Sequence, residues 1–326
     1  MNNLFDFATK ELSQDAFICY LLNFVHEDNI GEDKELQNCA IDFLEKITEK
    51  NPIKENILVT DIKRQHHHID ILVEVNKKFH ILIEDKVYTY QKIKQIENYK
   101  NKLKKEGKNN IITVYYKMIG QDRPEQVDVN IGRKDMIEIL KPYINKTKNT
   151  IIKNYYEYIS YIDSEFNLFK SAPIDDWSHN AYRGFYEFLT KEDAEVINTD
   201  GIWGWKYVSN PSGGFIGLWW FFIEGKDLIN TGLQYEGVTA IHLQIEKNKI
   251  TLKVQSEIPL KNNVKWDIFN TIIKDCNIPD FKKPKRFGYG KTVTIGYIEY
   301  DENNYLERIN IMEELMQDIQ NGKFTV

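Results

Sequence analysis

Residues 68–88 read HIDILVEVNKKFHILIEDKVY, and this stretch decides the fold of the first half of the chain. On either side of NKK, apolar residues alternate with polar ones, which is the period of a β-strand. A register that pairs Val75 with Phe79 matches the apolar residues on one face and leaves Asn76-Lys77-Lys78 as a three-residue turn, a common hairpin length. The stretch therefore predicts an antiparallel β-hairpin with one apolar face.

The other face of this hairpin carries charge. The same register places Asp70 opposite Glu84, with Lys86 two residues further along the second strand. Two opposed carboxylates repel each other across a strand pair, so a cation is needed nearby. Lys86 supplies one, and Mg²⁺ or Mn²⁺, which prefer oxygen ligands, would supply more. The pattern suits metal-assisted hydrolysis of a phosphodiester, and the alternative is an exposed hairpin whose outer face happens to be charged.

The spacing of apolar residues around the hairpin predicts a small mixed sheet flanked by helices. The fold class is therefore α/β in the broad sense, and α+β in the narrower classification. Ser13 is the expected N-cap of the first helix. The expected elements are helices 14–26 and 33–49, strands 57–63, 69–75 and 79–87, helix 90–106, strand 111–116, and helices 134–144 and 150–162.

The character of the sequence changes near residue 170, where we expect a domain boundary between 1–170 and a β-rich domain 171–326. Its expected elements are helix 177–190, strands 203–209, 214–223, 238–245, 249–256 and 292–300, and helix 303–321. Aromatic residues alternate along these strands, which favours a sheet core over a stacking platform for unpaired bases. The run FKKPKRFGYGK, residues 281–291, is a candidate nucleic-acid contact.

Charge is unevenly distributed along the 326 residues, whose net charge is −6. From Lys86 to Lys108, eight lysines stand against Glu97 and Glu106, a local balance of +6 that leaves −12 for the remainder. Such a local patch suits a confined polyanion site, although lysines that merely solvate an exposed helix are the alternative. No P-loop is present, so the sequence gives no sign of ATP hydrolysis.

Cysteine usage and hydropathy predict a soluble cytoplasmic protein. Cys19, Cys39 and Cys276 are odd in number and widely spaced, as expected for reduced thiols. No segment at the N-terminus resembles a signal peptide, and the apolar stretch 215–223 is too short to span a bilayer, so we expect no membrane association.

Two further motifs flank IDI at 69–71 and IEDK at 83–86 of the hairpin: Glu11 in the run KELSQDAF, and Gln95-Ile-Glu-Asn-Tyr99 on the next helix. In this order the chain resembles the PD-(D/E)XK nuclease superfamily, in particular a bacterial group with this core and a C-terminal extension. Ile69 stands where the superfamily's name has proline. The motifs cover roughly residues 1–165, and the resemblance implies a restriction-endonuclease-like core.

The resemblance also implies roles for these residues. Asp70, Glu84 and the main-chain carbonyl of Asp85 would bind the metal, Lys86 would assist the attacking water, and Glu11 would touch the metal directly or through water. Gln95 and Tyr99 match the helix that positions the lysine and the DNA backbone. Gln91 lies on the same side of that helix, and we expect it and Lys92 to bind substrate as well.

His66, His67 and His68 directly precede the hairpin. Strand alternation would place His66 and His68 on the face of Asp70, where they could contact phosphate. The alternatives are polar residues at the entrance of a strand and adventitious zinc binding.

The sequence thus predicts a metal-dependent, phosphodiester-hydrolysing deoxyribonuclease that uses Mg²⁺ or Mn²⁺, with a guessed role in defence against foreign DNA. The alternatives are an RNA nuclease and a non-catalytic nucleic-acid-binding or regulatory protein that keeps the fold. A second copy of the chain or an activating protein is left open as a partner.

Overall fold

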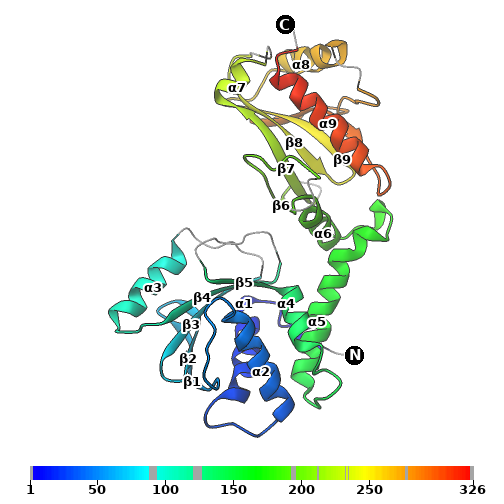
Figure 1. Cartoon of the computed structure of the whole chain (residues 1–326). Coiled ribbons are helices and arrows are strands. Elements are labelled where there is room, and N and C mark those ends of the chain that lie inside the picture. The colour runs from blue at the N-terminus through cyan, green and yellow to red at the C-terminus, as the bar shows by residue number, and fades with distance from the viewer. Residues whose placement is uncertain are drawn as a thin grey trace. The chain divides into compact units, whose positions relative to one another are not determined.

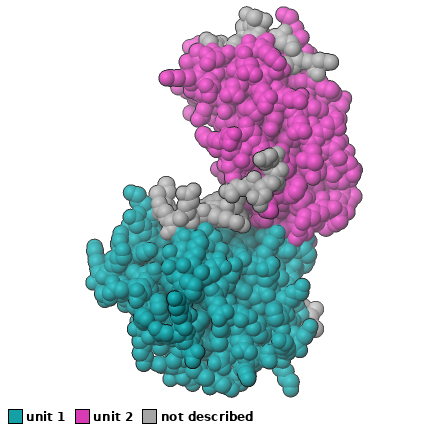
Figure 2. Space-filling view, in the orientation of Figure 1, with its two compact units in different colours: residues 1–164 teal, residues 165–326 magenta. Residues whose placement is uncertain are grey.

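The computed structural model describes residues 3–87, 94–119, 127–191, 196–210, 213–231, 233, 235–275 and 278–323. The chain divides into two compact units, Met1–Ser164 and Glu165–Val326, which Figure 2 shows in separate colours. No helix among the described residues is long and apolar enough to cross a membrane.

Unit 1 is built on one mixed sheet (Figure 1). Its elements are α1 (Glu11–Leu22), α2 (Lys34–Ile47), β1 (Val59–His66), β2 (Ile69–Val75), β3 (Phe79–Lys86), α3 (Gln95–Lys105), β4 (Ile111–Lys117), β5 (Val129–Gly132), α4 (Arg133–Leu140) and α5 (Thr150–Asn167), whose last residues belong to unit 2. Within the described residues the strands form a five-stranded sheet in the order β1-β2-β3-β4-β5. The pairs β1–β2 and β2–β3 are antiparallel, whereas β3–β4 and β4–β5 are parallel.

The register of the β2–β3 hairpin is the predicted one, with Val75 opposite Phe79 and Ile71 opposite Ile83. The two faces of these strands pack against different helices. Leu72 and Leu82 form a buried cluster with Tyr99 and Leu103 of α3. The opposite face, which includes Asp85, is met by α1, whose Gln14 side chain hydrogen-bonds to Asp85. The ends of β2 and β3 therefore lie between α1 and α3.

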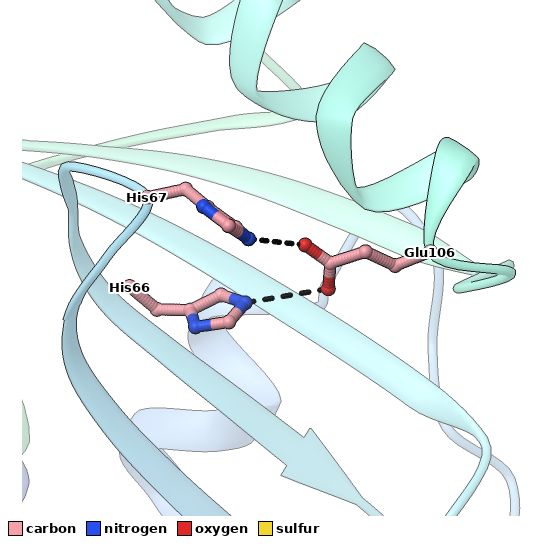
Figure 3. A group of neighbouring side chains, drawn as sticks. All are labelled: His66, His67 and Glu106. Atoms are coloured by element: carbon pink, nitrogen blue, oxygen red, sulfur yellow. Dashed lines mark hydrogen bonds and ion pairs between the residues drawn. The ribbon is translucent and has the colours of Figure 1, made fainter.

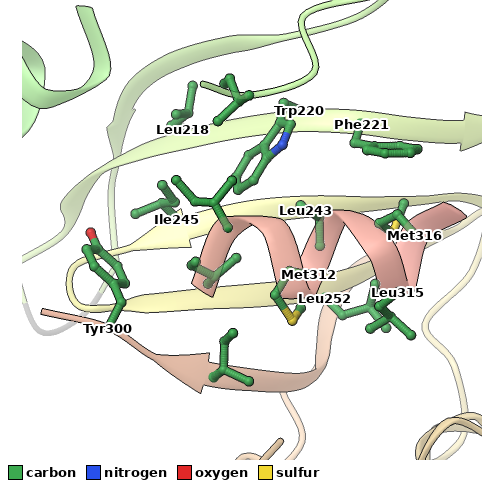
Figure 4. Packing of buried hydrophobic residues seen from close by; sticks show 14 of the residues in the cluster. Leu218, Trp220, Phe221, Leu243, Ile245, Leu252, Tyr300, Met312, Leu315 and Met316 are labelled. Atoms are coloured by element: carbon green, nitrogen blue, oxygen red, sulfur yellow. The ribbon is translucent and has the colours of Figure 1, made fainter. Parts of the chain in front are cut away.

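Unit 2 contains an antiparallel sheet in the order β10-β9-β8-β7-β6. Its elements are α6 (His179–Leu189), β6 (Gly204–Val208), β7 (Phe215–Glu224), α7 (Gly225–Ile229), β8 (Val238–Glu246), β9 (Lys249–Ser256), α8 (Asn262–Asp275), β10 (Thr292–Glu299) and α9 (Tyr305–Gln320). Figure 4 shows Met312, Leu315 and Met316 of α9 packing against the apolar face of the sheet around Trp220 and Leu243. Trp205, Trp220 and Phe221 are buried in this core, as a sheet core of aromatic residues predicted. Trp220 and Phe221 are neighbours and do not alternate, because β7 is irregular between Trp220 and Ile223.

The element predictions need four corrections. Helix α1 begins at Glu11 with Lys10 as its N-cap, so Ser13 lies inside the first turn and is not the cap. Strand β5 and the helices α7 and α8 were not predicted. The segment 88–93, which includes the expected start of the third helix, lies outside the described residues, as does Cys276.

Candidate active site

Asp70 lies near the start of β2, and Glu84, Asp85 and Lys86 end β3. The paired residues of this hairpin end at Ile71 and Ile83. Beyond this pair, a side chain replaces the main-chain contact between the strands: Asp70 Oδ2 accepts a hydrogen bond of 3.0 Å from the main-chain N–H of Asp85. The other oxygen, Oδ1, accepts from Gln65 Nε2 at 3.2 Å. Asp70 is thus held in a fixed orientation where the two strands separate.

Three oxygen atoms converge on the ammonium group of Lys86. Its Nζ lies 3.2 Å from Asp70 Oδ2 and 2.6 Å from Glu84 Oε1, and it donates to the main-chain oxygen of Asp85 at 2.7 Å. These oxygens belong to the two carboxylates and the main-chain carbonyl that the family resemblance implies as metal ligands. Because the two carboxylates and the carbonyl already contact one cation together, they are close enough to bind a single metal ion. The donor set fits a divalent ion that prefers oxygen ligands.

A second oxygen of Glu84 is also available. Glu84 is fully buried, and its Oε2 is one of the buried side-chain atoms that have no hydrogen-bond partner within the described part of the chain. A buried carboxylate oxygen without a donor is costly, and a cation would remove that cost. This is a second observation that the residues present fit a bound metal.

The site carries more negative than positive charge, and this raises the pKa values of both Glu84 and Lys86. Burial, with the nearby charge of Asp70, raises the pKa of Glu84 to about 7. Burial by itself lowers the pKa of Lys86, but the charges of Glu84 and Asp70 more than offset this and raise it. Lys86 is therefore an ammonium at neutral pH, held there by the carboxylates that surround it.

Helix α3 places two predicted residues beside Glu84. Gln95 Nε2 donates to Glu84 Oε1 at 2.6 Å and lies 2.9 Å from the hydroxyl of Tyr99, one helical turn further on. Tyr99 is buried in the cluster that fastens α3 to the sheet. Hydrogen bonds thus connect Tyr99 to Gln95, and Gln95 to Glu84, a candidate metal ligand. Gln91 and Lys92, also predicted to bind substrate, lie outside the described residues.

Glu11 begins α1 and reaches the end of β3, where its Oε1 accepts a hydrogen bond of 3.3 Å from the main-chain N–H of Val87. It therefore lies beside the residue that follows Lys86. Glu11 is thus the first residue of α1 and does not precede the helix as expected, and its contact at this place is with a main-chain N–H.

Two residues of α1 belong to this region although they were not predicted from the sequence. Gln14 donates from Nε2 to Asp85 Oδ1, and Asp15 is buried next to Asp85. Burial, with the charge of Asp70, raises the pKa of Asp15 to about 6, and burial with the charge of Asp15 raises the pKa of Asp85 well above its usual range. Asp15 Oδ1 and Asp85 Oδ2 are both buried without a hydrogen-bond partner within the described residues, which disfavours the charged form of each carboxyl.

A signal for this pair was present in the sequence. Asp85 shares the face of the apolar residues of β3, so a buried acid there requires a polar partner from the helix that covers that face. Gln14-Asp15 in the first apolar helix was the available candidate.

The histidines do not lie where strand alternation placed them. His67 and His68 form a two-residue turn between His66 and its partner Ile69, with φ of +53° and +71°. The turn interrupts the alternation, and His66 and His67 both contact Glu106, the C-cap of α3. Strand alternation therefore ends at His66 and does not decide which face His67 and His68 take.

The geometry agrees with a comparison against known protein families. The family model of the PD-(D/E)XK nuclease superfamily matches residues 2–187, more than half of the 326 residues. The chain therefore belongs to the PD-(D/E)XK nuclease superfamily, which confirms the predicted family and fold class and indicates a nuclease. Comparison with curated proteins and with solved structures found no match.

Proposed function

We propose that the chain is a divalent-metal-dependent nuclease that hydrolyses phosphodiester bonds in DNA. The observation that carries this proposal is the convergence of Asp70 Oδ2, Glu84 Oε1 and the Asp85 carbonyl on one cation, the Lys86 ammonium. Oxygen donors of this kind suit Mg²⁺ or Mn²⁺. Either ion, bound there, would polarise the scissile phosphate and lower the pKa of a bound water.

The protein's own groups supply the rest of the chemistry. The Lys86 ammonium is held at the metal ligands and is suited to donate hydrogen bonds to the attacking water and to a phosphate oxygen as negative charge develops there. Gln95 and Tyr99 position Glu84 through the hydrogen bonds between them. Glu11 is proposed to contact the metal directly or through water, and Gln91 and Lys92 to bind the substrate.

DNA is the proposed substrate because the superfamily resemblance implies it, and a lysine-rich helix lies next to the site. In the last turn of α3, Lys102, Lys104 and Lys105 are exposed. The first residue of this helix, Gln95, contacts Glu84, so the exposed cations lie on the helix that reaches the site, and they suit a nucleic-acid backbone.

The test is cleavage of supercoiled plasmid, linear duplex, single-stranded DNA and structured RNA in Mg²⁺, Mn²⁺ or EDTA. We expect metal-dependent cleavage of DNA that Asp70→Asn and Glu84→Gln each reduce by at least about a hundredfold. Glu74→Gln is the matched control, because Glu74 lies on the same strand and contacts Thr60 and His80 instead of the site.

Each other outcome rejects part of the proposal. Cleavage that survives both substitutions would remove Asp70 and Glu84 from the site, and cleavage of RNA alone would make the chain an RNA nuclease. No cleavage in any metal, with no heat of Mn²⁺ binding that Asp70→Asn abolishes, would favour a non-catalytic nucleic-acid-binding protein.

A further inference from the structure

A second group of side chains that could hold a metal ion consists of His66 and His67 at the turn between β1 and β2 and Glu106 at the end of α3 (Figure 3). His66 Nε2 is 3.3 Å from Glu106 Oε2, and His67 Nε2 is 2.5 Å from Glu106 Oε1. The two imidazole rings lie 4.3 Å apart between centroids, and both point toward the same carboxylate. Three donor atoms from two separate segments of the chain thus meet at one point.

The donor set differs in kind from that of the nuclease site. Imidazole nitrogen suits Zn²⁺, Co²⁺, Ni²⁺ or Cu²⁺, whereas Mg²⁺ takes oxygen ligands. Metal–ligand bonds of about 2.0–2.2 Å in a tetrahedral site put neighbouring donor atoms about 3.3–3.5 Å apart. The three donor atoms here all lie within 4.8 Å of one another, so small side-chain rotations bring them to that spacing. The exposed fractions of the side chains, 25%, 49% and 29%, leave a side open for water as the fourth ligand.

The backbone of the turn is a second and independent observation. His67 and His68 have φ of +53° and +71°, a left-handed conformation that a two-residue hairpin turn usually assigns to Asn-Gly or Gly-Gly. A residue with a side chain costs about 1–2 kcal/mol in this conformation. The turn brings the ring of His67 to the same carboxylate as that of His66, which strand alternation would have kept on the other face.

Glu106 can serve a metal without losing its existing partner. Lys108 Nζ lies 2.8 Å from Glu106 Oε2. An ionised carboxylate has about four lone-pair positions, so the lysine and a metal can be bound together. The lysine also keeps the carboxylate ionised, since its hydrogen bond lowers the pKa of Glu106 to about 2.

We propose that His66, His67 and Glu106 bind one transition-metal ion of the Zn²⁺ class, and that the ion fastens the C-terminal end of α3 to the β1–β2 turn. Glu106 is the C-cap of α3, and the same helix carries Gln95 and Tyr99 at its other end. A metal crosslink here would therefore fix the helix whose first residue contacts Glu84.

The binding test uses the full chain without a histidine tag, stripped of metal and kept in excess Mg²⁺ so that oxygen-ligand sites are filled. Titration with ZnCl₂ in a calorimeter is expected to show one site per chain. His66→Gln, His67→Gln and Glu106→Gln should each weaken binding by at least about tenfold, because even outer-shell changes cost 10–100-fold at metal sites. His68→Gln is the matched control, since it changes the same turn outside the cluster, and Asp70→Asn should also bind zinc normally.

Two further readouts decide between a built site and surface binding. Co²⁺ in place of Zn²⁺ should give the visible spectrum of a four-coordinate ion, which His67→Gln loses and His68→Gln keeps. Zinc should slow amide hydrogen exchange at the end of α3 and in the β1–β2 turn. The proposal is overturned if zinc does not bind, if His68→Gln weakens binding as much as the other variants, or if bound zinc leaves this exchange unchanged.

Discussion

Lys86 is the residue at which cleavage and binding should separate. Its ammonium contacts the candidate metal ligands from a buried position, whereas the exposed lysines of α3 are the ones placed to meet a nucleic-acid backbone. We expect Lys86→Ala to lower the cleavage rate by at least about a hundredfold while duplex affinity changes by less than about threefold. Cleavage assays and fluorescence anisotropy in Ca²⁺ measure the two effects.

Lys78→Ala is the control for that substitution, since Lys78 is an exposed lysine at the turn of the same hairpin and pairs with Glu55. Urea unfolding should accompany both variants, because removing Lys86 leaves the buried Glu84 without its cation. A folded Lys86→Ala protein that has lost most of its duplex affinity would contradict the role assigned to this lysine.

At the scale of single residues, strand parity was sufficient to find Asp70, Glu84 and Lys86, because side chains on one face of a hairpin are fixed by the register. It did not find Asp15, whose importance comes from the contact of helix α1 with Asp85 on the face that this helix covers. That contact depends on how α1 lies on the strands, which periodicity does not specify. The pairing of His66 with His67 was missed for a similar reason, since alternation ends where a turn begins.

At the scale of elements, α3 is expected to carry much of the electrostatic attraction to DNA. Replacing Lys102, Lys104 and Lys105 together with glutamine should flatten the dependence of log affinity on log salt concentration, by up to about 0.9 for each phosphate that these lysines neutralise. Anisotropy with labelled duplex between low and moderate salt measures the slope.

The matched control for this helix replaces Lys134, Lys141 and Lys148 with glutamine. These lysines are also exposed, and the change in net charge is the same. A slope that falls equally in both triple variants would mean that overall charge, and not α3, governs binding; an unchanged slope would make the α3 lysines a solvated surface.

The elements that the sequence predicted and those that it missed differ in how they are stabilised. The β2–β3 hairpin and the Glu246–Lys249 hairpin carry alternation on both strands, so local pattern and tertiary pairing agree. Strand β5 has only four residues and, among the described residues, pairs only with β4, so it gives little alternation to detect. Helix α8 has the apolar residues Trp266 and Ile273 at exposed positions among polar residues. The spacing of its apolar residues therefore does not mark one buried face.

At the scale of the whole molecule, the division into two units gives each its own spectroscopic signal. All six tryptophans lie between residues 177 and 266, within unit 2. Tryptophan fluorescence therefore follows the unfolding of unit 2 without a contribution from the nuclease unit. The same unit contains two of the seven histidines, His179 and His242.

His242 should make unit 2 less stable in mild acid. It is buried in β8, its ring stacks on Phe222, and its Nδ1 has no hydrogen-bond partner within the described residues. Burial, with the charge of Lys253, lowers the pKa of His242 to about 3 from an ordinary value of 6.5. Between these values the unfolded chain binds the extra proton, so stability is full above about pH 6.5 and falls as the pH is lowered.

The expected loss between pH 7 and 5.5 is about 1 kcal/mol, since one pKa unit corresponds to about 1.4 kcal/mol. Urea unfolding followed by tryptophan fluorescence at a series of pH values measures it. His242→Gln should remove most of this loss, because glutamine does not titrate. His179→Gln should keep it, because His179 is exposed at the start of α6. If wild-type unit 2 is equally stable at both pH values, or if the two variants behave alike, the stability of this unit does not depend on a buried neutral histidine.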